Sequence, residues 1–167
     1  MREIPLKLFE NLDQQGKTHQ KLLSALTHEL GLKPSFNSED LTTLENLQQK
    51  KYQVLDKLKE LDSDLAQIID AIGAEWGITE KPTIWDLIDG SQQSDAQRLK
   101  KQREELMGSI DKISDLSQRT AEKSNARLKP IKQLNENISG IRDFSSTYVL
   151  SGKLKKLAQA RIISRSI

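Results

Sequence analysis

The sequence has no cysteine, only four prolines and few aromatic residues among its 167 residues. Without cysteine there can be no disulfide, no zinc–thiolate site and no thiol nucleophile. Aromatic residues make up 4% of the chain, and a sheet-rich fold is disfavoured because strands prefer aromatic and β-branched side chains. The sequence contains no run of ~18 apolar residues, the length needed to span a membrane. The first five residues lack the apolar stretch of a signal peptide. We therefore expect a cytoplasmic, all-α protein.

Patterns that would indicate catalysis or metal binding are also missing. His19 and His28 are nine residues apart, about half a turn out of phase on a helix, so they cannot share a metal. We expect His19 in the core and His28 on the surface. Residues 62–64 resemble the start of a calcium loop, but the next positions lack a further oxygen ligand and the turn glycine. There is no glycine-rich phosphate loop and no nucleophile elbow. We expect no enzymatic activity, no cofactor and no metal.

The most informative feature that is present is a long seam between Leu99 and Ile141, whose positions alternate three and four residues apart. This spacing keeps side chains on one helix face and predicts a helix packed lengthwise on other helices. The seam is apolar at both ends and polar from Ser117 to Arg127. Either small residues there let helices pack closely, or the bundle thins and a partner docks. Pro130 predicts a kink or break.

Similar seams and breaker residues predict the other helices and the domain organisation. We expect helices at about 6–30, 39–72, 83–89 and 94–144, forming an elongated antiparallel bundle of three long helices with a short helical tip and a C-terminal arm. Residues 1–152 would be one domain, and residues 153–167 a basic amphipathic or disordered tail. Helix boundaries are expected at a few capping and breaking residues, namely Gly31, Asn37 or Ser38, Gly73, Gly77 and Ser94.

The region around residues 73–94 contains both tryptophans, Trp76 and Trp85. We interpret them as the core of a cap that closes the end of the bundle. A tip that binds a partner is the alternative.

Charge is distributed unevenly along the chain. Residues 1–118 hold 15 Lys/Arg and 21 Asp/Glu, whereas residues 119–167 hold 11 Lys/Arg and only 3 Asp/Glu. The basic C-terminal part is either a solvated helix face or a region with a separate binding role.

The order of features resembles the FlgN family of flagellar export chaperones. The resemblance rests on residues 41–65 (LTTLENLQQKKYQVLDKLKELDSDL), on residues 125–128 (NARL) and above all on residues 146–152 (STYVLSG). It covers about residues 8–152, and the tryptophan-containing tip and Pro130 depart from it.

The resemblance implies a cytoplasmic chaperone that binds the C-terminal helices of hook–filament junction proteins, prevents their premature assembly and delivers them to the export gate. It implies that the C-terminal part recognises the cargo, and that Tyr148 contacts the gate. The candidate partner-binding residues are Ile131, Leu134, Ile138, Ile141, Phe144, Tyr148, Leu150, Leu154 and Leu157. Two alternatives remain open: a nucleic-acid-binding helical arm that uses the basic C-terminal third, and a purely structural coiled-coil homodimer. The scarcity of aromatic residues for base stacking weighs against nucleic acid.

Overall fold

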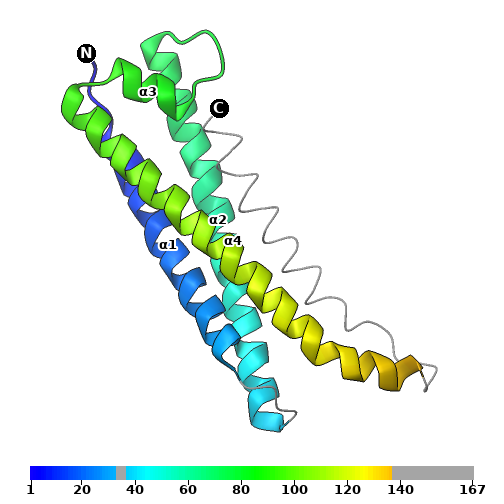
Figure 1. Cartoon of the computed structure of the whole chain (residues 1–167). Helices are drawn as coiled ribbons and strands as arrows, with labels where there is room; N and C mark the ends of the chain where they lie inside the picture. Colours follow the sequence, from blue (N-terminus) through cyan, green and yellow to red (C-terminus); the bar gives the residue numbers. More distant parts are fainter. Residues whose placement is uncertain (33–36, 137–167) are drawn as a thin grey trace.

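The structure, a computed structural model, describes residues 1–32 and 37–136, with side chains as far as Ala126. This part of the chain forms α1 (Leu6–Gly31), α2 (Ser38–Trp76), α3 (Ile84–Gly90) and α4 (Gln93–Glu136), and it contains no strand. Figure 1 shows α1, α2 and α4 lying lengthwise beside one another, with α3 across one end. The predicted all-α bundle of three long helices with a short helical tip is confirmed. The predicted C-terminal arm and tail lie outside the described residues.

Helix α1 packs along both α2 and α4. The Gln102 side chain donates to the Phe9 carbonyl at 3.4 Å, and Lys123 Nζ donates to the Leu32 carbonyl at 2.8 Å. These partners are 93 and 91 residues apart, so the offset between α1 and α4 is nearly constant along the bundle. The two helices therefore run parallel, and α2 runs antiparallel to both.

Two capping residues fix the ends of α2. The Asn37 side chain accepts a hydrogen bond from the Asp40 N–H at 2.8 Å, which makes Asn37 the N-cap. Gly77 adopts the left-handed conformation, with φ at 72°, and ends the helix. Gly73, which we expected to help end this helix, instead lies inside it. A Cβ at Gly73 would be 2.5 Å from Pro82 Cγ, so glycine is needed there for close packing.

The tip, which we define as residues 77–92 together with the end of α2, contains the two tryptophans in different environments. Trp76 is buried and packs so closely on Gly90 that a Cβ there would be 2.9 Å from its ring. Trp85 is 38% exposed, and the Arg103 guanidinium lies 4.5 Å from its ring centroid. The expectation that both rings are core is therefore wrong for Trp85, because α3 is a short helix with one buried face.

The ends of α3 and α4 differ slightly from the expected ones. Thr83 is the N-cap of α3 and forms a capping box with Asp86. Helix α4 begins at Gln93, and the Gln92 carbonyl accepts the Ala96 N–H, so Ser94 is inside the helix rather than its cap.

Of the kink or break expected at Pro130, the break does not occur, because α4 continues to Glu136. Proline's fixed φ is itself helical, so a helix can pass through it at the cost of one backbone hydrogen bond and of a clash between the ring and the carbonyl four residues earlier.

The buried apolar side chains form two clusters along the bundle. The larger one is at the tip end and joins all four helices through residues such as Leu8, Ile72, Leu87 and Leu99. The smaller one joins the three long helices nearer the opposite end, which we call the hairpin end because residues 32–37 connect α1 to α2 there. Burial of this apolar surface, at roughly 25 cal/mol per Å², drives the helices together.

The N-terminal segment closes the tip by hydrogen bonds from several elements. The Arg2 backbone bonds to Gly90 and Gln92, and its guanidinium donates to the Trp76 carbonyl at 2.6 Å. The Ile4 N–H donates to the Asp95 carboxylate at 2.9 Å. The residues before α1 therefore tie together the end of α2 and the start of α4.

Candidate partner-binding site on helix α4

Helix α4 is longer than the helix it runs beside. Lys123 reaches the last carbonyls of α1, donating to those of Leu30 and Leu32. Because α1 ends at Gly31, residues 124–136 of α4 continue past it. At ~1.5 Å per residue this extension is roughly 20 Å long. Figure 1 shows the C-terminal end of α4, in orange, diverging from α1 and α2.

The contact between Lys123 and the end of α1 has a simple electrostatic basis. The final carbonyls of a helix have no partner inside the helix and carry partial negative charge. An ammonium group satisfies them and is stabilised there. Lys123 therefore marks the level at which α4 stops packing on α1 and the extension begins.

The part of the polar centre that precedes Lys123 in the sequence is buried between the helices. Ser117 and Thr120 are each 2% exposed, and the Thr120 hydroxyl donates to the Leu116 carbonyl at 2.7 Å. Small side chains at these positions let the helices approach closely. Of the two interpretations of the polar centre, close packing is therefore the one the structure supports for these two residues.

An ion pair is buried between α1 and α2 at the hairpin end. Lys51 Nζ donates to the Glu29 carboxylate, and the Gln48 amide donates to the same carboxylate at 3.1 Å. Lys51 is the one polar position between Leu47 and Leu58 in the apolar seam of α2, and that seam alone does not identify Glu29 as its partner. The signal was present in α1, because Glu29 follows Leu22, Ala25 and Leu26 on the same buried stripe.

Two of the nine predicted partner-binding residues, Ile131 and Leu134, lie on the α4 extension. The structure describes the backbone there and not the side chains. The other seven, from Ile138 to Leu157, lie outside the described residues. The two apolar ends of the seam therefore lie in different surroundings. The apolar seam residues from Leu99 to Ile113 are in the core, whereas Ile131 and Leu134 come after the end of α1. Lys123 is the residue at this boundary that sequence reasoning missed.

The two histidines lie where the sequence indicated. His19 is buried and His28 is exposed. Within residues 1–32 and 37–136 no group of three or more histidine, cysteine or acidic side chains is arranged to hold a metal ion. None of the described helices is long and apolar enough to cross a membrane.

The comparisons with known proteins agree with this architecture. The sequence matches the family described as FlgN protein over residues 5–156. No curated protein and no solved structure matches the chain. The match covers most of the chain, including all four helices. The chain therefore belongs to the FlgN family, a family of flagellar export chaperones.

Proposed function

We propose that this protein binds the C-terminal helical segments of hook–filament junction proteins in the cytoplasm, keeps them unassembled and delivers them to the export gate. Membership of the FlgN family supports the chaperone role. The single observation that carries the choice of site is the extension of α4 past Lys123, where its sequence returns to apolar seam positions.

The register of α4 explains why the extension suits a partner helix. Counting by three and four residues from the buried Ile113, Ser117 and Thr120 leads to Ile131 and Leu134. The same stripe that packs inside the bundle therefore continues where α1 has ended. An amphipathic helix that would otherwise self-associate is protected when its apolar face lies on such a stripe.

The remaining candidate residues extend this surface in sequence, ending with Leu154 and Leu157. A segment that orders only on contact spends part of the interaction energy on ordering, so it binds reversibly. Reversible binding suits a chaperone that must release its cargo at the gate. Tyr148 is proposed to contact the gate, by resemblance to the family.

The test is calorimetric titration of the full-length protein with a synthetic C-terminal segment of a hook–filament junction protein. Ile131→Asp and Leu134→Asp should each weaken binding by about 10-fold or more, because a charge would replace an apolar contact. Gln133→Asp is the matched control, since it adds the same charge off the seam. Circular dichroism should show unchanged helicity in all three variants.

Two results would count against the proposal. Equal affinity of the Ile131→Asp, Leu134→Asp and Gln133→Asp variants would show that the seam does not hold the cargo. Global unfolding of the two seam variants would show that this part of α4 is core.

A further inference from the structure

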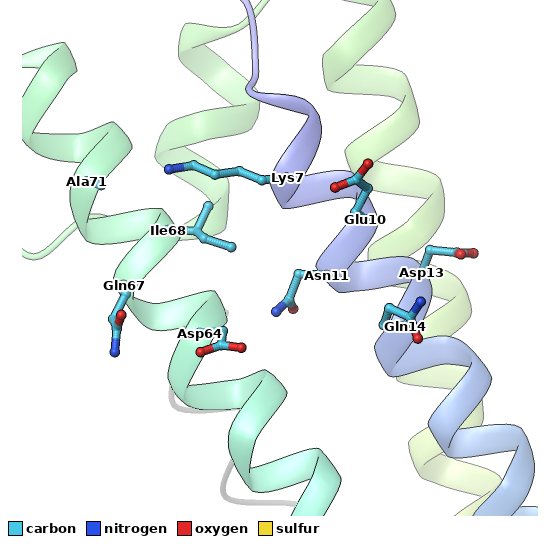
Figure 2. A pocket seen from close by; sticks show the side chains of 9 residues that line it. All are labelled: Lys7, Glu10, Asn11, Asp13, Gln14, Asp64, Gln67, Ile68 and Ala71. Atoms are coloured by element: carbon cyan, nitrogen blue, oxygen red, sulfur yellow. The ribbon is translucent and has the colours of Figure 1, made fainter.

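One face of the α1–α2 pair is grooved along most of its length. Two hollows lie on it, of about 770 Å³ toward the tip and about 630 Å³ toward the hairpin end, and every residue that lines them belongs to α1 or α2. Figure 2 shows the hollow toward the tip, where Lys7 and Asn11 of α1 extend toward α2 across from Asp64 and Ile68, whereas Asp13 points away from α2. Helix α4 packs on another side of α1, and the hollow between those two helices shares Asp13 and Gln20 with the hollows of the α1–α2 face.

The two hollows follow one another along the same face of the α1–α2 pair, and we call them together the α1–α2 groove. On α1 the lining positions 7, 11, 14, 18, 21, 25 and 28 alternate four and three residues apart, so they form one stripe. On α2 the positions 47, 50, 54 and 57 continue in the same alternation to 64, 68 and 71. From Lys7 to His28 the groove is roughly 32 Å long, at ~1.5 Å per residue.

The two halves carry opposite charge. The tip half is lined by the carboxylates of Glu10 and Asp64 and by one lysine, Lys7, while Asp13 lies at its edge, where it also lines the hollow toward α4 and pairs with Lys17. The hairpin half is lined by three lysines and by no carboxylate. Its lysines are Lys21, Lys50 and Lys57.

Apolar side chains lie between these charges in both halves. Ile68 and Ala71 line the tip half, and Ala25, Val54 and Leu47 line the hairpin half. The groove therefore offers some apolar contact at its floor and a reversal of charge along its rim.

From this pattern we propose that the α1–α2 groove is a self-complementary interface, on which two copies of this chain pair antiparallel about a two-fold axis. In a two-fold interface both subunits use the same surface patch. A two-fold axis through the middle of the groove lays the acidic half of each copy on the basic half of the other. A parallel arrangement would instead oppose like charges, so the charge order selects the antiparallel one. This pairing leaves the α4 extension uncovered and does not depend on what α4 binds.

The expected association is weak and sensitive to salt. A face about 32 Å long and two helices wide covers roughly 600 Å² on each copy, with each helix ~10 Å across. That is at the low end of specific interfaces. Exposed charges more than a Debye length apart are screened, and that length is ~10 Å at 0.1 M salt and shorter above it. We expect the dimerisation constant to fall by about 10-fold or more when sodium chloride is raised from about 50 to 500 mM.

The decisive experiment uses two charge-reversed forms of the full-length chain. Glu10→Lys with Asp64→Lys gives both halves of the groove a net positive charge, and Lys21→Glu with Lys50→Glu gives both halves a net negative charge. All four residues are exposed, so folding should be retained. By sedimentation equilibrium each form alone should be a monomer, and the equimolar mixture should form a heterodimer.

A matched control carries the same charge change elsewhere. Glu104→Lys with Asp111→Lys alters two exposed positions of α4 outside the groove, and this form should dimerise like the unmodified chain. The proposal is overturned if the unmodified chain is monomeric at low salt, if its dimer survives both reversals, or if the mixture fails to associate.

Discussion

The Lys51 ammonium and the Glu29 carboxylate form an ion pair inside the bundle, with 4% and 2% of the two side chains exposed. Five other ion pairs between described side chains are each more than half exposed. Removing two charges from water is costly, and their mutual attraction offsets this cost only when both partners are present. The pair also fixes which residue of α2 lies beside the end of α1, because any other register would leave a buried charge unpaired.

Removing one partner of this pair should destabilise the bundle strongly. Glu29→Gln or Lys51→Met should lower the free energy of unfolding by ~3–5 kcal/mol, because the remaining group stays buried without its counter-charge. The double replacement Glu29→Leu with Lys51→Leu should be close to the unmodified chain. Urea denaturation followed by circular dichroism measures the free energy of unfolding of the single and double variants. Lys59→Met, which breaks an exposed pair with Asp56, is the control and should change little. Additive losses in the double variant would contradict this account.

The stability of the protein should depend on pH through His19. Burial lowers the pKa of His19 from 6.5 to about 4, and its Nδ1 has no hydrogen-bond partner among the described residues. As the pH falls, the unfolded chain therefore binds a proton at His19 at a higher pH than the folded chain does. The contribution of neutral His19 is complete above pH 6.5 and is lost as pH falls toward 4, by roughly 3 kcal/mol in total.

The comparison of two histidine variants isolates this effect from that of the carboxylates. His19→Leu should make the urea midpoint fall less steeply between pH 6.5 and 4 than in the unmodified chain. His28→Leu, at an exposed position, should leave the slope unchanged. Identical slopes for all three proteins would mean that His19 is not buried in solution.

Two glycines inside helices should respond in opposite directions to alanine. Gly73→Ala places a Cβ 2.5 Å from Pro82, so the tip must shift and stability should fall by about 1–3 kcal/mol. Gly108→Ala meets nothing within 4 Å and should raise stability by ~0.5–1 kcal/mol, since alanine favours the helix. Thermal unfolding gives the sign of each change. A neutral Gly73→Ala would show that the residues around Pro82 yield easily.

Deletion of residues 145–167 should separate folding from cargo binding. Both core clusters are built from residues between Ile4 and Leu116, so the helical bundle should retain its melting temperature within a few degrees. Binding of the junction-protein segment should be lost, because four of the nine candidate residues, Tyr148, Leu150, Leu154 and Leu157, are removed. A shortened chain that still captures the segment with full affinity would place recognition on α4 before residue 145.

Much of the fold could be predicted because helix seams have a strong period. Leucines spaced three and four residues apart predicted both α1 and α2, and Asn37 was one of the two residues predicted to cap the start of α2. The errors came from contacts between residues distant in the sequence. Gly73 indicates a helix end by itself, and only the position of Pro82 explains why a glycine lies inside the helix.

The candidate site was less predictable, for a related reason. Ile131 and Leu134 look the same in sequence as the buried Ile110 and Ile113. What distinguishes them is that α1 ends at the level of Lys123, and this depends on the pairing of two helices about 92 residues apart. Local patterns contain no information on that register.

The parallel pairing of α1 and α4 has a consequence for how the chain is made. Helix α1 leaves the ribosome first, but the residues of α4 that cover it are synthesised about 90 residues later. At 5–20 residues per second, α1 would wait roughly 5–20 s for the part of α4 that covers it. During that interval the nascent hairpin exposes the apolar stripe that α4 will cover. Closing such a long loop also opposes early folding, so the bundle should be completed only near the end of translation.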